Sequence, residues 1–159
     1  MMWNIDNNTL PLSTITELSE TKTAKTVHTY DFSTLYTNIP HDDLKVKMRW
    51  IVDKAFHNNS KHCMYVSNYR NSATWYKRRN TYSISKEKLL DFIDYLIDNI
   101  YVTAGNHVFR QTVGIPMGTD CAPYLANLYL YAIEFNYLNN LMKSNIHTAR
   151  KLSLSYRFI

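Results

Sequence analysis

Residues 30–41 read Tyr-Asp-Phe-Ser-Thr-Leu-Tyr-Thr-Asn-Ile-Pro-His and join two hydrophobic patterns of different period. From Thr26 to Ser33, β-branched and aromatic side chains alternate with polar ones, which predicts a strand with Asp31 near its end. After Pro40, the adjacent carboxylates Asp42 and Asp43 suit the positive end of a helix dipole. An apolar stripe then follows at helical spacing: Leu44, Met48, Ile51, Val52, Ala55 and Phe56. The segment therefore predicts a strand, a turn and an amphipathic helix that ends at residues 58–60.

The chain beyond this helix alternates short strands with further helices. Residues 61–82 have no clear period and predict a loop or an irregular strand pair. Ser85 caps a second predicted helix, and two β runs around Gly105 predict a hairpin. Pro123 opens a long helix, and residues 152–159 alternate as a last strand. The expected buried faces are Leu89, Phe92, Ile93, Leu96, Ile97 and Ile100 in the second helix, and Leu125, Leu128, Ala132, Phe135, Leu138 and Met142 in the long one. We expect an α+β fold.

Composition places the chain among ordinary globular proteins. Of its 159 residues, 45% are hydrophobic and 19% are charged, which is too apolar for wholesale disorder. No run reaches the ~18 apolar residues of a membrane span, and the first residues lack the pattern of a signal peptide. We therefore expect a soluble intracellular protein with Cys63 and Cys121 reduced. The basic run at residues 77–79 is too short to identify a nuclear localisation signal, so the sequence leaves a nuclear location open.

Positive charge is concentrated in one stretch. Residues 61–88 hold seven basic side chains and one acidic one, a net +6, whereas the whole chain carries +5. Aromatic residues interleave with these cations, a composition suited to stacking on bases while cations meet phosphates: Tyr65, Tyr69, Trp75, Tyr76 and Tyr82. The alternative is a solvated loop whose aromatic side chains pack back on the protein. His57, His62 and Cys63 lack the fourth ligand of a zinc site.

Two segments carry the chemistry that the sequence suggests. Asp31, at the end of a predicted strand, could hold a divalent cation, or it could cap the following turn. The chain has only three glycines, and two of them, Gly114 and Gly118, bracket Pro116. Such a ribbon lets the main chain lie flat against a planar ligand such as a base pair. Its alternative is a plain connection from strand to helix.

Residues 30–41, together with residues 114–123 (Gly-Ile-Pro-Met-Gly-Thr-Asp-Cys-Ala-Pro), resemble the palm of reverse transcriptases, and within that superfamily the Penelope-like retroelements. Both matches occur in the family's order, and the similarity extends more weakly over residues 26–159. The resemblance implies a partial right-hand polymerase palm over 26–159, with antiparallel strands and helices packed on one face. It also implies a basic finger-like insertion at about 58–84, after an irregular lead-in over residues 1–25 with a short helical turn near 13–18.

The resemblance also assigns roles. Asp31 matches the catalytic aspartate that binds both Mg²⁺ ions of a two-metal phosphoryl transfer, and the backbone carbonyl of Phe32 would add a ligand. Tyr36 matches the aromatic gate that packs on the sugar of the incoming dNTP and excludes a ribose 2′-hydroxyl. Gln111 and Met117 would contact the nucleotide, although many reverse transcriptases have glutamine where Met117 stands. The positions under the templating pair of RNA template and DNA primer would be Gly114, Ile115, Pro116 and Gly118, and those on the nucleic-acid backbone Arg70, Lys77, Arg78 and Arg79.

A third motif of the family carries an adjacent Asp-Asp pair. Residues 156–159 resemble its beginning, and the pair is expected directly after Ile159. Two Mg²⁺ ions about 4 Å apart repel by roughly 17 kcal/mol at an effective dielectric of about 20, and Asp31 is a poor counterweight for both. The resemblance implies an RNA-directed DNA polymerase, a nucleotidyltransferase, in an intact parent with fingers and thumb. We expect the 159-residue chain to bind Mg²⁺ weakly or not at all and not to polymerise DNA.

Two alternatives remain open at this point. The chain could be a non-catalytic nucleic-acid-binding remnant of a retroelement that uses only its aromatic and basic stretch. Salt-dependent binding without Mg²⁺-dependent primer extension would favour that hypothesis. The second alternative is the palm of a viral RNA polymerase. The aromatic Tyr36 and the Gly114–Gly118 segment resemble that family less than they resemble reverse transcriptases.

Overall fold

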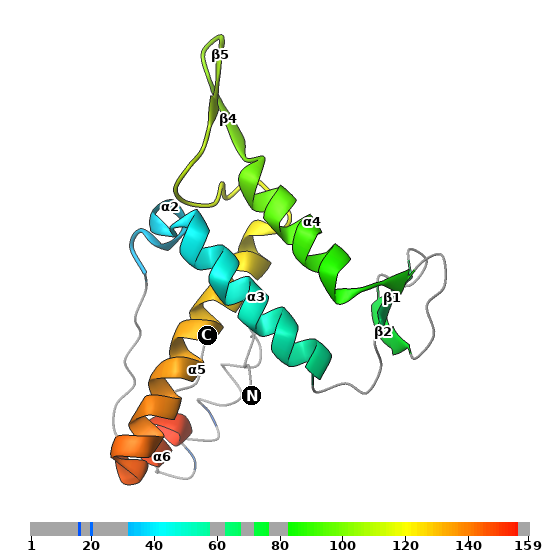
Figure 1. Cartoon of the computed structure of the whole chain (residues 1–159). Coiled ribbons are helices and arrows are strands. Elements are labelled where there is room, and N and C mark those ends of the chain that lie inside the picture. Colours follow the sequence, from blue (N-terminus) through cyan, green and yellow to red (C-terminus); the bar gives the residue numbers. More distant parts are fainter. Residues whose placement is uncertain are drawn as a thin grey trace. The chain divides into compact units, whose positions relative to one another are not determined.

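The computed structural model describes Thr16, Glu20 and residues 32–57, 63–67, 72–76 and 83–155, with side-chain exposure through residue 152 (Figure 1). The chain divides into two compact units, one of residues Thr34–Ala132 and one that combines Met1–Ser33 with Ile133–Ile159. Helices and small antiparallel sheets coexist, which confirms the α+β class. Most of the lead-in 1–25 and of the strand predicted before Asp31 lies outside the described residues, although Thr16 is helical within the predicted turn.

Helices dominate the unit Thr34–Ala132. A short α2, Leu35–Asn38, precedes α3, His41–His57, and α3 packs side by side with α4, Lys86–Asp98 (Figure 1). The long α5, Ala122–Ser144, begins in this unit. The predicted start of α3 is confirmed, with Asp42 and Asp43 in its first turn. The predicted cap of α4 is confirmed too, because the Ser85 side chain accepts a hydrogen bond from the Lys88 amide.

The core of this unit forms where α3, α4 and the start of α5 meet the segment before α3. The buried side chains of this core are Ile39, Leu44, Met48, Ile97, Ile115, Ala122, Leu125, Ala126 and Tyr129. Burying each of the larger aliphatic side chains contributes about 1.5–3 kcal/mol, which holds together helices that would be marginal alone. Leu44, Met48 and Val52 confirm the stripe predicted for α3.

One expectation for α4 is wrong. Phe92 was expected on the buried face of this helix, but its side chain is 56% exposed, whereas Ile97 is fully buried. Ile93 and Ile97 are one turn apart and face the core, and Phe92 is rotated by about 100° from Ile93. Near the end of α5, Met142 is likewise half exposed rather than buried. Hydrophobic spacing defined a stripe wider than the one that the neighbouring helices cover.

Short strands occur in two places. β1, Cys63–Ser67, pairs antiparallel with β2, Ser72–Tyr76, and with β3, Ser83–Ile84, in the order β2-β1-β3. The strand-pair alternative for residues 61–82 is therefore confirmed. The predicted hairpin is formed by β4, Tyr101–Ala104, and β5, His107–Arg110. Gly105 in its turn has a φ of 59°, the left-handed conformation that glycine adopts without strain.

The other unit is described mainly by residues 133–144 of α5 and by α6, Ile146–Ser155. The strand predicted from residue 152 is wrong as far as Ser155, because those residues end a helix. Asn145 caps α6 by accepting a hydrogen bond from the Thr148 amide, and Ala149 is buried. Over the described residues 152–155, the alternation Leu-Ser-Leu-Ser is outweighed by a helix that begins six residues earlier. Residues 156–159 lie outside the described part.

Among the described residues, no helix is long and apolar enough to span a lipid bilayer.

Candidate functional site

The two segments singled out by the sequence lie in direct contact. The Gly114 amide donates to the Ile39 carbonyl at 2.8 Å, and the Ile115 amide donates to the Tyr36 carbonyl at 2.6 Å. Pro40 and Val113 form an isolated antiparallel bridge beside them. We call this contact between residues 36–41 and 111–115 the ribbon junction. More than seventy residues separate the two segments in the chain, so neither local pattern by itself implies it.

Glycine at position 114 is required by the junction. Its φ is 85°, and a Cβ built there would lie 2.7 Å from the Tyr36 carbonyl oxygen and 2.8 Å from that of Thr37. Real Cβ atoms essentially never lie so close to other heavy atoms. At Gly118, in contrast, an added Cβ would meet nothing within 4 Å. The two glycines look equivalent in the sequence but differ in the structure. The close approach of the backbone of residues 36 and 37 requires glycine at position 114, whereas position 118 has room for a side chain.

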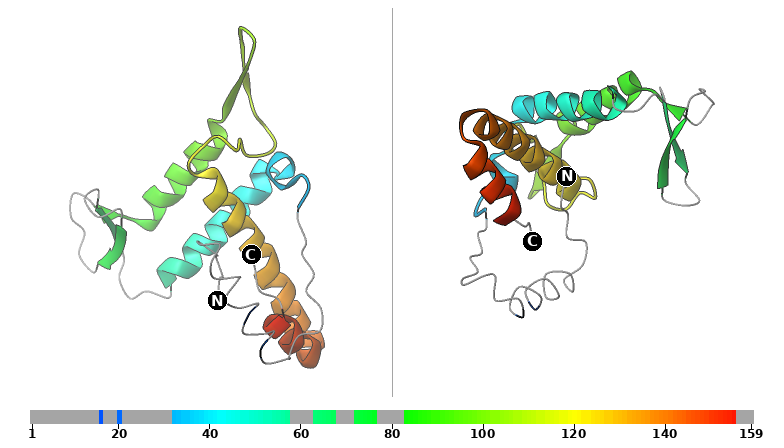
Figure 2. Two further views of the ribbon diagram at one scale, coloured as in Figure 1. Left: turned by 180° about the vertical axis from the view of Figure 1, so that it is seen from behind. Right: turned by 90° about the horizontal axis from the view of Figure 1, so that it is seen from below.

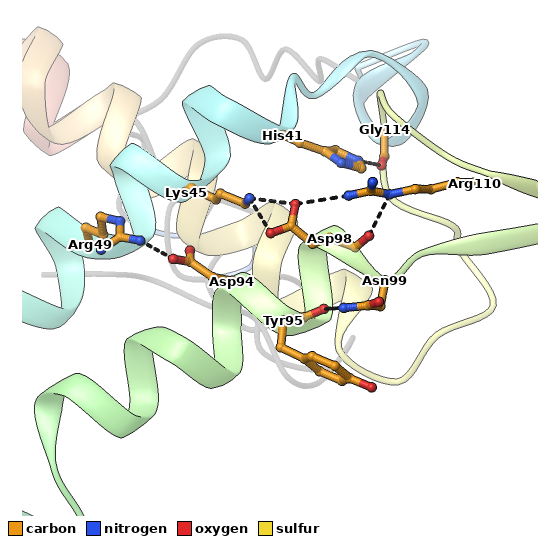
Figure 3. A network of polar contacts seen from close by, with 9 residues as sticks. All are labelled: His41, Lys45, Arg49, Asp94, Tyr95, Asp98, Asn99, Arg110 and Gly114. Atoms are coloured by element: carbon orange, nitrogen blue, oxygen red, sulfur yellow. Dashed lines mark hydrogen bonds and ion pairs between the residues drawn. The ribbon is translucent and has the colours of Figure 1, made fainter.

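Two polar side chains complete the junction. Nε2 of His41 lies 2.7 Å from the Gly114 carbonyl oxygen, and since that oxygen only accepts, Nε2 carries the proton (Figure 3). Nε2 of Gln111 donates to the Val113 carbonyl at 2.8 Å, and the Gln111 amide donates to the Ile100 carbonyl. Gln111, expected to contact a nucleotide, thus has its amide nitrogen engaged with the backbone of the ribbon itself.

The rest of the ribbon leads into α5 with mixed exposure. Ile115 is 2% exposed and belongs to the core, whereas Met117 is 73% exposed. The Pro116 carbonyl accepts from both the amide and the hydroxyl of Thr119, which forms a turn before Ala122. Of the predicted ribbon residues, Met117 therefore presents a large side chain to solvent, and Ile115 serves as an anchor.

The remaining predicted site residues are described only in part. Tyr36 is half-buried against the core, and Phe32 is largely exposed. Asp31 lies outside the described residues, as do the predicted backbone-binding residues Arg70, Lys77, Arg78 and Arg79. Within the described part of the chain, no three His, Cys, Asp or Glu side chains gather closely enough to hold a metal ion. The expected ligand Asp31 was outside that search.

Sequence reasoning missed an ionic network that lies next to the contact between His41 and Gly114 (Figure 3). Lys45 of α3 donates to both carboxylate oxygens of Asp98 at the end of α4, at 2.6 and 2.7 Å. Arg110, the last residue of β5, donates to the backbone and side chain of Asp98, and Arg49 pairs with Asp94 one turn earlier (Figure 3). The hydrogen bond from Lys45, followed by nearby positive charges, lowers the pKa of Asp98.

This network ties the strand that enters the ribbon to both helices. A sequence signal was present: residues 41, 45 and 49 recur every four positions on α3, and Asp94 and Asp98 do so on α4. Complementary charges at helical spacing indicate two helix faces that can pair, but only the fold shows that they do.

A second polar cluster joins α3 to α5. The Tyr129 hydroxyl donates to Asp43 at 2.7 Å, Lys47 pairs with the same carboxylate at 2.5 Å, and the Lys47 ammonium lies 4.8 Å from the centre of the Tyr129 ring. Burial, reinforced by Asp43, raises the pKa of Tyr129 to about 12. The hydrogen bonds from Lys47 and then Tyr129 lower the pKa of Asp43. Besides lying at the start of α3, Asp43 therefore links this helix to α5 through Tyr129.

The aromatic residues of the basic stretch behave differently from one another. Trp75 of β2 packs edge-on against Phe56 of α3, with ring centres 4.8 Å apart, as the alternative of aromatics packing back on the protein requires. Tyr76, the next residue, is 52% exposed. Both interpretations of this stretch therefore keep support.

Comparison with protein-family models, curated proteins and solved structures finds no match to this chain.

Proposed function

We propose that this chain is part of the palm of an RNA-directed DNA polymerase that resembles the Penelope-like reverse transcriptases. The ribbon junction is the observation that carries the proposal. In such a palm, the segment after Asp31 meets the sugar and metal of the incoming nucleotide, and the ribbon supports the base pair of that same nucleotide. The proposal therefore requires the two segments to be neighbours, and the hydrogen bonds of Gly114 and Ile115 supply that proximity.

In the proposed reaction, a primer 3′-hydroxyl attacks the α-phosphate of a dNTP between two Mg²⁺ ions. Positioning and charge neutralisation by the metals carry most of the catalysis. Asp31 would be the carboxylate of this segment that ligates the ions, with the Asp-Asp pair of a longer parent chain. Tyr36 would lie against the sugar, and the exposed Met117 would lie near the base pair.

Photocrosslinking tests where nucleic acid lies on the 159-residue chain. A primer–template carries 5-iodouracil at the primer terminus or at the templating position, and the crosslinked peptides are identified by mass spectrometry. We expect crosslinks in the peptides that contain residues 32–39 and 111–121. Crosslinks confined to other peptides would contradict the proposal.

A matched pair of glycine variants sharpens this experiment. Gly114→Val places side-chain atoms against the carbonyls of Tyr36 and Thr37, so it should abolish the two expected crosslinks together. Gly118→Ala adds a methyl group in open space and should leave them unchanged. Crosslinks that survive Gly114→Val would show that the junction is not where the nucleic acid binds.

The second candidate is non-catalytic nucleic-acid binding by the stretch 61–88. The net charge of +6 over this stretch favours it, together with the rings of Tyr65 and Tyr76, whose centres are 6.0 Å apart on neighbouring strands. Under this hypothesis, crosslinks fall in the peptides that contain β1 and β2 and persist in Gly114→Val. The same experiment therefore separates the two candidates.

A further inference from the structure

The small sheet of β1, β2 and β3 presents different side chains on its two faces. Successive residues of a strand point to opposite faces, and residues paired across the ladder share a face. Trp75 pairs with Met64 and packs against Phe56 of α3, so one face of the sheet lies toward that helix. Tyr65 and Tyr76 lie one residue further along β1 and β2 and therefore belong to the other face, which we call the tyrosine face.

Two aromatic rings dominate the tyrosine face. The ring centres of Tyr65 and Tyr76 lie 6.0 Å apart, with an angle of 59° between the ring planes. Tyr76 is 52% exposed, and Tyr65 is half-buried. The residues opposite Tyr65 on the neighbouring strands, Thr74 and Ser83, have short side chains. The exposed part of Tyr76 is therefore open to a flat ligand such as a base.

Charge complementarity indicates what kind of flat ligand suits this face. Arg70 lies two residues before β2, and three cations, residues 77–79, directly follow Tyr76 in the sequence. Residues 61–86 contain neither aspartate nor glutamate. Aromatic rings in a stretch of such charge match a polymer that carries flat bases on an anionic backbone.

From this arrangement we infer that the tyrosine face binds single-stranded nucleic acid by stacking unpaired bases on Tyr65 and Tyr76. The inference rests on the second candidate function, and it adds the form of the nucleic acid and the side chains that meet the bases. Every base has a π face, so such stacking tolerates any sequence. In a duplex the bases are already paired and stacked on one another, so their faces are closed to the two rings.

The tyrosine face is separate from the ribbon junction. His41 at the start of α3 contacts Gly114 of the junction. Phe56 near the end of α3 contacts Trp75 of the sheet, and both views in Figure 2 show the strands at that end of the helix. From position 41 to position 56 the helix rises by about 1.5 Å per residue, so about 22 Å separates the two contacts. Substitutions on the tyrosine face therefore test stacking there without touching the junction.

The test measures binding of the full 159-residue chain to fluorescein-labelled oligothymidylate and to a DNA duplex by fluorescence anisotropy. Tyr65→Leu/Tyr76→Leu keeps apolar bulk but removes both rings, so binding to oligothymidylate should weaken by about 30-fold or more. Duplex binding should stay unchanged, as should the slope of log K against log salt, because no charge is removed. Tyr65→Phe/Tyr76→Phe keeps both rings and should bind like the unmodified chain.

A matched control removes two exposed rings elsewhere. Phe92 and Tyr95 of α4 are 56% and 64% exposed, and Phe92→Leu/Tyr95→Leu should leave binding unchanged. An equal loss in this control, or an equal loss of duplex binding by Tyr65→Leu/Tyr76→Leu, would overturn the inference. Circular dichroism checks that each variant keeps the fold of the unmodified chain.

A crosslinking experiment on the unmodified chain needs no substitution in the sheet. Oligothymidylate with 5-iodouracil at one position is irradiated with the protein, and the modified residues are identified by mass spectrometry. We expect the crosslinks at Tyr65 and Tyr76. Crosslinks at other residues alone would overturn the inference even if a substituted sheet failed to fold.

A third variant separates this inference from the second candidate function. Lys77→Gln/Arg78→Gln/Arg79→Gln removes three cations from the basic stretch, so the salt slope for oligothymidylate should flatten by about 2. If the slope flattens but Tyr65→Leu/Tyr76→Leu binds normally, the basic stretch binds nucleic acid and only the stacking inference fails. If neither variant changes binding, or the unmodified chain binds no nucleic acid, both fail.

Discussion

Substitution of Gly114 by alanine tests the ribbon junction through the stability of the fold. A side chain in the left-handed region costs about 1–2 kcal/mol. The new Cβ would also lie within 2.9 Å of three atoms, two of which are backbone oxygens of residues 36 and 37. To relieve that contact, the ribbon must withdraw and give up the hydrogen bonds of Gly114 and Ile115, at about 0.5–1.5 kcal/mol each. The expected loss of unfolding free energy is therefore about 2–5 kcal/mol, a large share of the ~5–15 kcal/mol typical of a domain.

The three glycines of the chain form a graded series for this assay, which is urea denaturation followed by circular dichroism. Gly105→Ala has a positive φ but open space, so it should cost only the conformational term of about 1–2 kcal/mol. Gly118→Ala has neither feature and should lie between neutral and about 1 kcal/mol more stable. The reasoning is refuted if Gly114→Ala loses no more stability than Gly105→Ala, because the close approach to residues 36 and 37 would then carry no energy.

Three further predictions concern the polar clusters and the proposed chemistry. Tyr129→Phe removes the hydrogen bond to Asp43 and should lower the free energy of unfolding by about 1–2 kcal/mol. In a spectrophotometric titration, the variant should lack the tyrosine that ionises near pH 12. An unchanged titration would show that the raised pKa does not belong to Tyr129. The pKa values of Asp43 and Asp98 are lowered in the folded state, so their contribution to stability is present above the ordinary value of 3.8 and is lost as pH falls through the folded values. Asp98→Asn should therefore make the free energy of unfolding less dependent on pH below about 4. Acid titration of the unmodified chain and of the variant would check this. In a chain that includes the Asp-Asp pair, Asp31→Asn should abolish primer extension and Tyr36→Ala should raise ribonucleotide incorporation. Unchanged sugar selection in Tyr36→Ala would contradict the gate assignment.

The predicted elements that the structure confirms are those whose signals are local. The start of α3 at Asp42 and Asp43, the cap of α4 at Ser85 and the turn at Gly105 each depend on residues within one turn or one hairpin. Such signals act through the dipole, the capping hydrogen bond and the allowed backbone conformation. They need no knowledge of what packs against the element.

The predictions that are wrong concern residues whose environment depends on packing against other elements. Phe92 is as apolar as Ile93, but only Ile93 faces the core that α3 and α5 complete. Residues 152–155 alternate like a strand, yet they end a helix that Asn145 caps and Ala149 anchors. In both cases the local pattern was compatible with more than one partner, and packing selected the outcome.

The sequence by itself determined where α3, α4, α5, the hairpin and the concentrated charge occur, because these depend on side chains within a few positions of one another. Only the tertiary structure decided that Gly114 lies against residues 36 and 37 while Gly118 does not, and that Lys45 and Arg110 share Asp98. The physical reason is that close backbone approach and ion pairing depend on distances across the core. Those distances depend on how the helices pack together, and they cannot be predicted from residues that are close in the sequence.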